Sequence, residues 1–358
     1  MADDQLLAEW RELQREVASR VVERSSGDCS YCSSRCVRVR EEGGGEAGGR
    51  TGRFEILTSW NFDAESLYGG VDVSFASAAA AGGKGSAVAV YVVLRRKKKE
   101  NYKRRQQHSD IMSDNYELIY SDSVRYSPSV PYMSGYLAFR EIEPLLTLIR
   151  RQVEQQPECT PRIILVDGNG MLHPRRAGIA CFLGVRTGIP TIGIGKKLCC
   201  VEDCWTISEA DSAIALGLRD AGMALTETRN IPSNGLILDT KGVSFVETDS
   251  GPDTCEDVPS IKDSAAIVLD GKFKGYATYL RSSNGTLLGA ALVGHGGKAY
   301  GALRGKPTSN PIYISVGHDI SLKEAIVVCE ELSDVRIPEP VRTADLMGRK
   351  LIRESIAR

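Results

Sequence analysis

The order of secondary-structure signals between residues 68 and 218 restricts the possible fold of this 358-residue chain more than any other feature. Three strand-like segments come first, at 68–75, 87–94 and 116–121. The second of them, AVAVYVVL, is apolar throughout, as expected of a strand buried on both faces. The pattern then alternates between helical and strand periodicity. We predict helices over 137–154, 177–187 and 210–218, with strands over 163–166 and 190–194.

Three strands followed by helix, strand, helix and strand is the order of a ribonuclease H-like α/β domain. We therefore predict a central mixed sheet, three antiparallel strands and then parallel strands, flanked by helices. The first and fourth strands are neighbours at the centre of such a sheet. Further strands are predicted over 266–269, 274–280, 287–293 and 312–316. A final helix begins after Ser321, which forms a capping box with Glu324.

Composition along the chain suggests a main domain with additions. We predict that residues 1–53 are an N-terminal helix (4–24) and a flexible Gly-rich insertion (25–52) that holds too little apolar surface to fold. The main domain is predicted over 54–350, with a C-terminal tail at 351–358. Insertions are expected at about 76–86, 95–110 and 247–262. The basic run RRKKKENYKRR at 95–105 could contact phosphates, act as a nuclear address or simply be a solvated loop.

The charge balance excludes a strongly basic nucleic-acid binder, because 45 basic and 46 acidic side chains leave a net charge of −1. No apolar run reaches the roughly 18–20 residues of a membrane helix, so we expect no membrane partner. The first residues resemble neither a secretory signal nor a transit peptide, which favours the cytoplasm, the nucleus or both. A zinc site at Cys29, Cys32 and Cys36 would need a fourth ligand that no nearby histidine supplies.

Three acids lie where an apolar context makes a charge expensive. Asp72 interrupts the first predicted strand, Asp167 ends the fourth, and Glu141 lies in the first turns of the helix between them. If they meet, their mutual repulsion favours a cation, and oxygen ligands favour Mg²⁺, or Mn²⁺ in its place. Two such ions would suit phosphodiester hydrolysis. Taken singly, each acid is better explained as a strand-end turn or a helix-start residue.

Other candidates are weaker. His318 follows a strand and could transfer a proton near neutral pH, and His173 is similar. Lys196 follows a strand end and could hold a phosphate. Tyr132, braced by Pro131, could wedge into a base stack, although a tyrosine is more often structural.

Six blocks in the right order resemble the endonuclease V family over about residues 54–350. They are VDVSF (71–75), PYMSGYLAFRE (131–141), ILVDGNGMLHPRRAGIACFLGV (164–185), PTIGIGK (190–196), ISVGHDISL (314–322) and RIPEPVRTADLMGR (336–349). The helix at 4–24 also resembles that family's N-terminal helix.

The resemblance implies a Mg²⁺-dependent endonuclease that cuts the second phosphodiester bond 3′ to inosine or deoxyinosine, leaving 3′-hydroxyl and 5′-phosphate ends. It implies that Asp72, Glu141 and Asp167 are metal ligands, and that His318 and Lys196 belong to the catalytic site. It places Tyr132, with Pro131, at the strand-separating wedge and His173 near the substrate. Backbone groups around Gly168 are expected to read the edge of a base that has been turned out of its stack.

The wedge motif reads PYMSG where bacterial members have PYIPG, which resembles the eukaryotic form and favours single-stranded RNA over DNA as substrate. We expect a monomer, and protein partners cannot be read from the sequence. Two alternatives remain: a module that binds inosine-containing nucleic acid without cutting it, and a related nuclease with another target such as a flap or junction.

Overall fold

The protein is described by a computed structural model that covers residues 2–24, 32–41, 51–59, 65–76, 86–97, 111–198, 243–247, 264–269, 272–282, 285–294 and 311–356. The predicted helix at 210–218 and the predicted insertions at 76–86, 95–110 and 247–262 lie mostly outside these residues, as does Cys29. None of the helices in the described part of the chain is long and apolar enough to cross a membrane.

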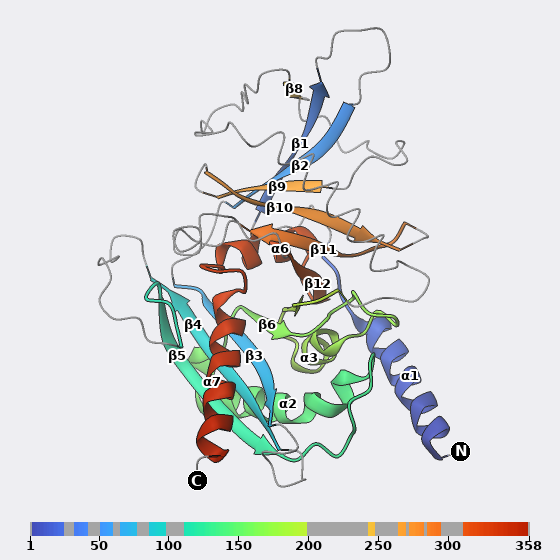
Figure 1. The fold of residues 1–358 in the computed structure, drawn as a ribbon, viewed down its shortest axis with the longest axis vertical. Coiled ribbons are helices and arrows are strands. Elements are labelled where there is room, and N and C mark those ends of the chain that lie inside the picture. Colours follow the sequence, from blue (N-terminus) through green and yellow to red (C-terminus); the bar gives the residue numbers. More distant parts are fainter. Residues whose placement is uncertain are drawn as a thin grey trace.

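One mixed sheet organises the fold (Figure 1). Its strands are β1 (Cys32–Glu41), β2 (Thr51–Ser59), β3 (Leu67–Phe75), β4 (Ala87–Arg96), β5 (Tyr116–Tyr126), β6 (Ile163–Asp167), β7 (Thr191–Gly195), β8 (Val243–Glu247), β9 (Ser264–Leu269), β10 (Lys272–Arg281), β11 (Leu287–Gly294) and β12 (Ile312–His318). They lie in the order β5-β4-β3-β6-β7-β12-β11-β10-β9-β2-β1-β8. β3, β4 and β5 are antiparallel, whereas β3, β6 and β7 are parallel. This confirms the predicted ribonuclease H-like order, including the central β3–β6 pair.

Within the described residues the helices are α1 (Ala2–Arg20), α2 (Leu137–Gln155), α3 (Ile179–Thr187), α6 (Leu322–Glu331) and α7 (Glu339–Ile356), with a 3-10 turn, η3, at Pro157–Cys159. The capping box of Ser321 and Glu324 at the start of α6 is present as predicted. Two sequence-based predictions were wrong. The tail expected at 351–358 is, up to Ile356, the end of α7, and residues 32–41 of the expected loop form β1, which pairs with β2 and β8.

The apolar run in β4 is explained by helices on both faces of the sheet. Val88, Val90, Val92 and Leu94 pack in one core with residues of α6 and α7. Ala89, Tyr91 and Val93 alternate with them and pack in a second core with residues of α1, α2 and α3. Because side chains alternate along a strand, an entirely apolar strand is what a sheet covered on both faces requires.

Candidate metal centre

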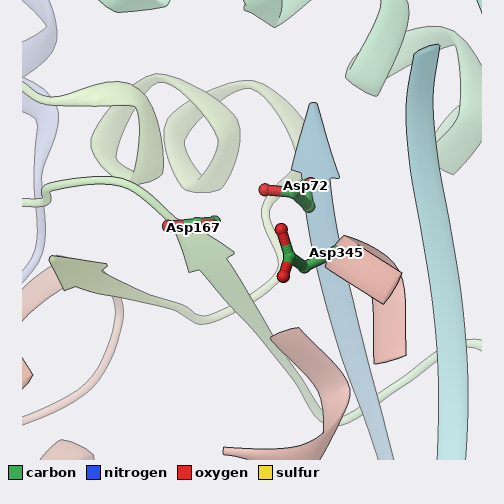
Figure 2. Close-up of side chains that lie close together, drawn as sticks. All are labelled: Asp72, Asp167 and Asp345. Atoms are coloured by element: carbon green, nitrogen blue, oxygen red, sulfur yellow. The ribbon is translucent and has the colours of Figure 1, made fainter. Parts of the chain in front are cut away.

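Three aspartates from distant parts of the chain meet at the end of the central strands (Figure 2). Asp72 lies on β3, Asp167 ends the neighbouring β6, and Asp345 lies on α7. One carboxylate oxygen from each lies within 4.8 Å of the other two. The sequence predicted the first two members of this cluster, but the third was not among the predicted site residues.

Asp345 reaches the cluster because α7 lies directly against β3. A Cβ atom at Gly70 would lie 2.2 Å from the backbone of Pro340, and one at Gly348 would lie 2.5 Å from Ser74 Oγ. Gly70 and Ser74 flank Asp72 at two-residue spacing, so the three share the strand face toward α7. Two glycines therefore allow the close approach that holds Asp345 beside Asp72.

Glu141 approaches the same place from the other side of the sheet. It lies in the first turns of α2, which packs with the core on the opposite face from α7, and only 5% of it is exposed. Burial, and then the charges of Asp72 and Asp167, raise the pKa of Glu141 to about 8. Glu141 is thus a close electrostatic neighbour of the three aspartates, although it does not belong to the tight group itself.

Asp72 is buried among like charges and is only 6% exposed. Burial is the main cause that raises the pKa of Asp72 to about 8, followed by the hydrogen bond and charge of Asp167 and the charge of Asp345. Ser74 Oγ donates a hydrogen bond of 3.2 Å to Asp72 Oδ2. A carboxyl group in this position is costly to ionise unless a cation lies close by.

Lys196 supplies a positive charge to the cluster. Its Nζ lies 2.5 Å from Asp167 Oδ2 and 3.7 Å from Asp345 Oδ1. Burial alone would lower the pKa of Lys196, but the neighbouring charges of Asp167, Asp345 and Asp72 raise it overall. Arg349 pairs with Asp345 from one helical turn further along α7, at 2.9 Å. The predicted association of Lys196 with the acids is therefore present in the geometry.

The donor set fits a hard divalent cation. All of the ligand atoms that converge here are carboxylate oxygens, which Mg²⁺ and Mn²⁺ prefer. A bound cation would lower the raised pKa of Asp72 and would offset the repulsion among the three carboxylates.

The structure does not bring His318 to the carboxylates. β12 runs antiparallel to β7, and His318 pairs with Thr191 at the start of β7, whereas Asp167 pairs with Ile194 near its end. Three residues of strand separate the two positions by about 10 Å. The imidazole Nδ1 instead accepts a hydrogen bond of 3.3 Å from the Val22 amide. A proton-transfer role for His318 in this cluster is therefore not supported.

His173 was expected near the substrate, but it is 5% exposed and both its ring nitrogens have partners within the protein. Nδ1 accepts from the Arg175 amide at 3.2 Å, which leaves the proton on Nε2, 3.0 Å from the Gly135 carbonyl oxygen. Burial, followed by the charge of Arg175, lowers the pKa of His173 to about 4. It is a neutral residue that supports a loop.

The backbone conformation and the close packing at position 168 require a glycine. Its φ is +152°, and a Cβ atom there would lie 2.5 Å from Ile179 Cγ2. Its amide donates to the Ile194 carbonyl at 3.0 Å. The Gly170 and Met171 amides donate to Ser315 Oγ and the Val316 carbonyl. These three amides are already bonded within the protein, so a base edge read by backbone groups of this loop, as we predict, would have to be read by its other backbone groups.

Tyr132, unlike the buried His173, is exposed to solvent. It is 72% exposed, the largest value among the exposed large hydrophobic residues in the described part of the chain, and it lies beside Pro131 in the loop before α2. Because the ring is exposed, Tyr132 does not contribute to the core of the fold. An exposed aromatic ring in the loop before α2 is compatible with the predicted wedge.

This fold and site define a ribonuclease H-like α/β protein with a carboxylate centre suited to a divalent cation. The Endonuclease V family model matches residues 54–234 and 273–346. The chain belongs to the endonuclease V family.

Two mammalian proteins are also similar in sequence. Human endonuclease V is 34% identical over 240 residues, which are 67% of this chain and 62% of the human protein. Mouse endonuclease V is 32% identical over 67% of this chain and 52% of its own length. The match thus spans between about half and two thirds of these two relatives.

Solved structures also share the fold. The catalytic domain of human endonuclease V superposes with a TM-score of 0.59 at 28% identity, covering 99% of this chain and 98% of that one. Endonuclease V of Ciona intestinalis, solved with a 24mer DNA containing an inosine followed by a ribo-adenosine, superposes with a TM-score of 0.60 at 24% identity, covering 98% and 99%.

Proposed function

We propose that this protein is a Mg²⁺-dependent endonuclease that cuts nucleic acid at inosine, at the second phosphodiester bond on the 3′ side. The products would carry 3′-hydroxyl and 5′-phosphate ends. The observation that carries the proposal is the convergence of Asp72, Asp167 and Asp345 within 4.8 Å in a member of the endonuclease V family.

Each residue of the centre has a role that follows from its position. Asp72, Asp167 and Asp345 would hold the cation, with Glu141 adding negative charge from the α2 side. When bound, Mg²⁺ or Mn²⁺ supplies water activation and stabilisation of the leaving oxygen. Lys196, which pairs with Asp167, would bind a substrate phosphate beside the cation.

Tyr132 would act on the nucleic acid and not on the bond that breaks. Its exposed ring can stack on a base beside the inosine and stabilise the strand in an unstacked form. Unstacking costs least in single strands, so single-stranded substrates are expected to be cut best. We propose that inosine in RNA is preferred and that deoxyinosine in DNA is also cut, by a monomer in the cytoplasm or nucleus.

The test is cleavage by the purified full-length chain of matched single strands that carry inosine, deoxyinosine or adenosine at one position. With Mg²⁺ we expect one cut, one nucleotide 3′ of the inosine site, faster in RNA than in DNA. Adenosine strands should be cut far more slowly, and reactions with EDTA should stay intact. Tight inosine-dependent binding without cleavage would replace the nuclease with a binding module, and cleavage without inosine selectivity would point to another target structure.

A further inference from the structure

The loop that carries Tyr132 is anchored by its carbonyl groups at both ends. Before the loop, Arg140 Nη1 donates to the Val130 carbonyl at 3.2 Å. At its other end, Gly135 adopts φ +76° and presents its carbonyl oxygen to donors from two other parts of the chain. The four residues between these anchors, Pro131 to Ser134, include the exposed Tyr132.

Three side chains converge on the Gly135 carbonyl oxygen. Gln14 Nε2 lies 2.9 Å away, Arg175 Nη2 2.7 Å and His173 Nε2 3.0 Å. A carbonyl oxygen has two lone pairs, so three donors around one oxygen are more than a loop needs merely to be satisfied. Such an arrangement fixes the direction of the carbonyl and, with it, the last peptide of the loop.

Gln14 links the parts of this arrangement. It is 1% exposed, and besides donating to Gly135 its Oε1 accepts from Arg175 Nε. The Arg175 guanidinium lies 4.4 Å from the centre of the Tyr136 ring, which follows the loop directly. Gln14 thus orients both its own donor and that of Arg175.

The helix that carries Gln14 is itself held firmly. Trp10 stacks on Phe139 of α2 with 4.7 Å between ring centroids, and Arg11 Nε donates to Tyr136 Oη at 3.0 Å. Beyond the end of α1, Arg24 pairs with Asp319 at 2.8 Å. The helix therefore has a defined place from which Gln14 can act on the loop.

We propose that Gln14 is a positioning residue for inosine discrimination, because it fixes the Gly135 carbonyl and so presents Tyr132 in one orientation. This assignment rests on the proposed function of Tyr132. Because Gln14 is buried, it would act on the substrate only through the loop. The N-terminal helix α1 then contributes to substrate recognition.

The test uses Gln14→Leu and Gln14→Glu in the full-length chain. The leucine removes both hydrogen bonds, whereas the glutamate keeps the acceptor for Arg175 and loses the donor to Gly135. Gln5→Leu makes the same change at an exposed position of α1 and is the matched control. We expect the ratio of kcat/KM for inosine over adenosine strands to fall about tenfold in both Gln14 variants, which is the scale of one buried hydrogen bond. The control should match the wild type.

A double variant separates positioning from general damage. If Gln14 acts through Tyr132, Gln14→Leu should lower the ratio no further in a Tyr132→Ala background. Amide hydrogen exchange of residues 132–136 should be faster in the single Gln14→Leu variant than in the wild type. Additive losses in the double variant, or unchanged exchange in that segment, would overturn the proposal. A selective wild type whose Gln14 variants remain equally selective would overturn it while leaving the proposed function intact, whereas an unselective wild type would overturn both.

Discussion

The Nζ atom of Lys196 lies 2.5 Å from Oδ2 of Asp167, so an ammonium group sits at the edge of the carboxylate cluster that we assign to a divalent cation. The same Nζ is 3.7 Å from Asp345 Oδ1. Without a metal ion, this lysine pairs directly with Asp167, whereas Arg349 is the closer partner of Asp345, at 2.9 Å. Lys196 therefore offsets part of the repulsion that the cluster creates.

Replacing this lysine should change how strongly the protein depends on the metal. In Lys196→Met we expect the metal-free protein to lose stability on the order of 1 kcal/mol, since the ion pair is partly exposed. The rise in Tm on adding Mg²⁺ should then be larger than in the wild type, and cleavage should slow at least about tenfold. Thermal unfolding with EDTA and with Mg²⁺ measures the first two effects.

Lys197→Met is the control, because the neighbouring side chain is exposed. If Lys196→Met and Lys197→Met give the same Mg²⁺-induced shift in Tm, Lys196 does not offset the cluster.

The pH dependence of stability should carry the signature of the buried acids. The pKa values of Asp72 and Glu141 are raised to about 8, from 3.8 and 4.5, chiefly by burial. Between about pH 4.5 and pH 8 the folded state therefore holds protons that the unfolded state has lost, so metal-free stability falls as pH rises. Each such carboxyl group contributes at most about 1.4 kcal/mol per pH unit. Mg²⁺ displaces these protons, so its affinity should increase with pH.

Urea unfolding in EDTA at several pH values from 5 to 8 checks this, with Asp72→Asn as the comparison. The stability difference between wild type and variant should move in favour of the variant as pH rises. A difference that stays constant over this range would show that Asp72 is ionised throughout.

The contact between α7 and β3 predicts that even a methyl group at Gly70 lowers the stability of the protein. Gly70→Ala would place a Cβ atom 2.2 Å from the Pro340 backbone, which cannot turn aside as a side chain can. We expect a loss of about 1–3 kcal/mol of stability, typical of overpacking, and weaker Mg²⁺ binding because Asp345 is carried on the displaced helix. Lys350→Ala, exposed on the same helix, should do neither. Normal Mg²⁺ affinity in a folded Gly70→Ala protein would contradict the link between this contact and the metal centre.

Tyr132→Ala should act on recognition without affecting the fold, since the ring is exposed. Discrimination between inosine and adenosine strands is expected to weaken more than general binding does, because stacking on one base is worth about 1–3 kcal/mol. Binding and cleavage of both strands measure this, with Val153→Ala, another exposed apolar residue, as control. Equal losses on the two strands would count against a wedge.

The strands around the metal centre could be predicted because their apolar periodicity is strong. β3, β4 and β6 appear close to their predicted bounds, and Asp72 and Asp167 meet as expected. β1 was missed because CSSRCVRVRE reads as a polar, Cys-rich loop, and its pairing with β2 depends on distant parts of the chain.

Asp345 and His318 show what local patterns cannot supply. The prolines 338 and 340 obscured the start of α7, and the proximity of Asp345 to Asp72 depends on Gly70 and Gly348, whose role appears only when the helix is docked. The apolar residues Val341, Ala344 and Ile352, which are buried in the structure, lie at helical spacing in the sequence and were the signal that could have revealed the helix. His318 was misplaced because the direction of β12 relative to β7 is a tertiary property.

The most direct test of the account is Asp345→Asn, compared with Glu354→Gln, an exposed acid on the same helix. Calorimetric Mg²⁺ binding and cleavage of an inosine-containing single strand should both be measured on the full-length proteins. We predict that Asp345→Asn abolishes cleavage and weakens Mg²⁺ binding at least about tenfold, while strand binding persists, as Asp72→Asn and Asp167→Asn should also do. Glu354→Gln should behave as the wild type. Wild-type Mg²⁺ affinity and cleavage in Asp345→Asn would contradict the assignment of the three aspartates as the metal centre.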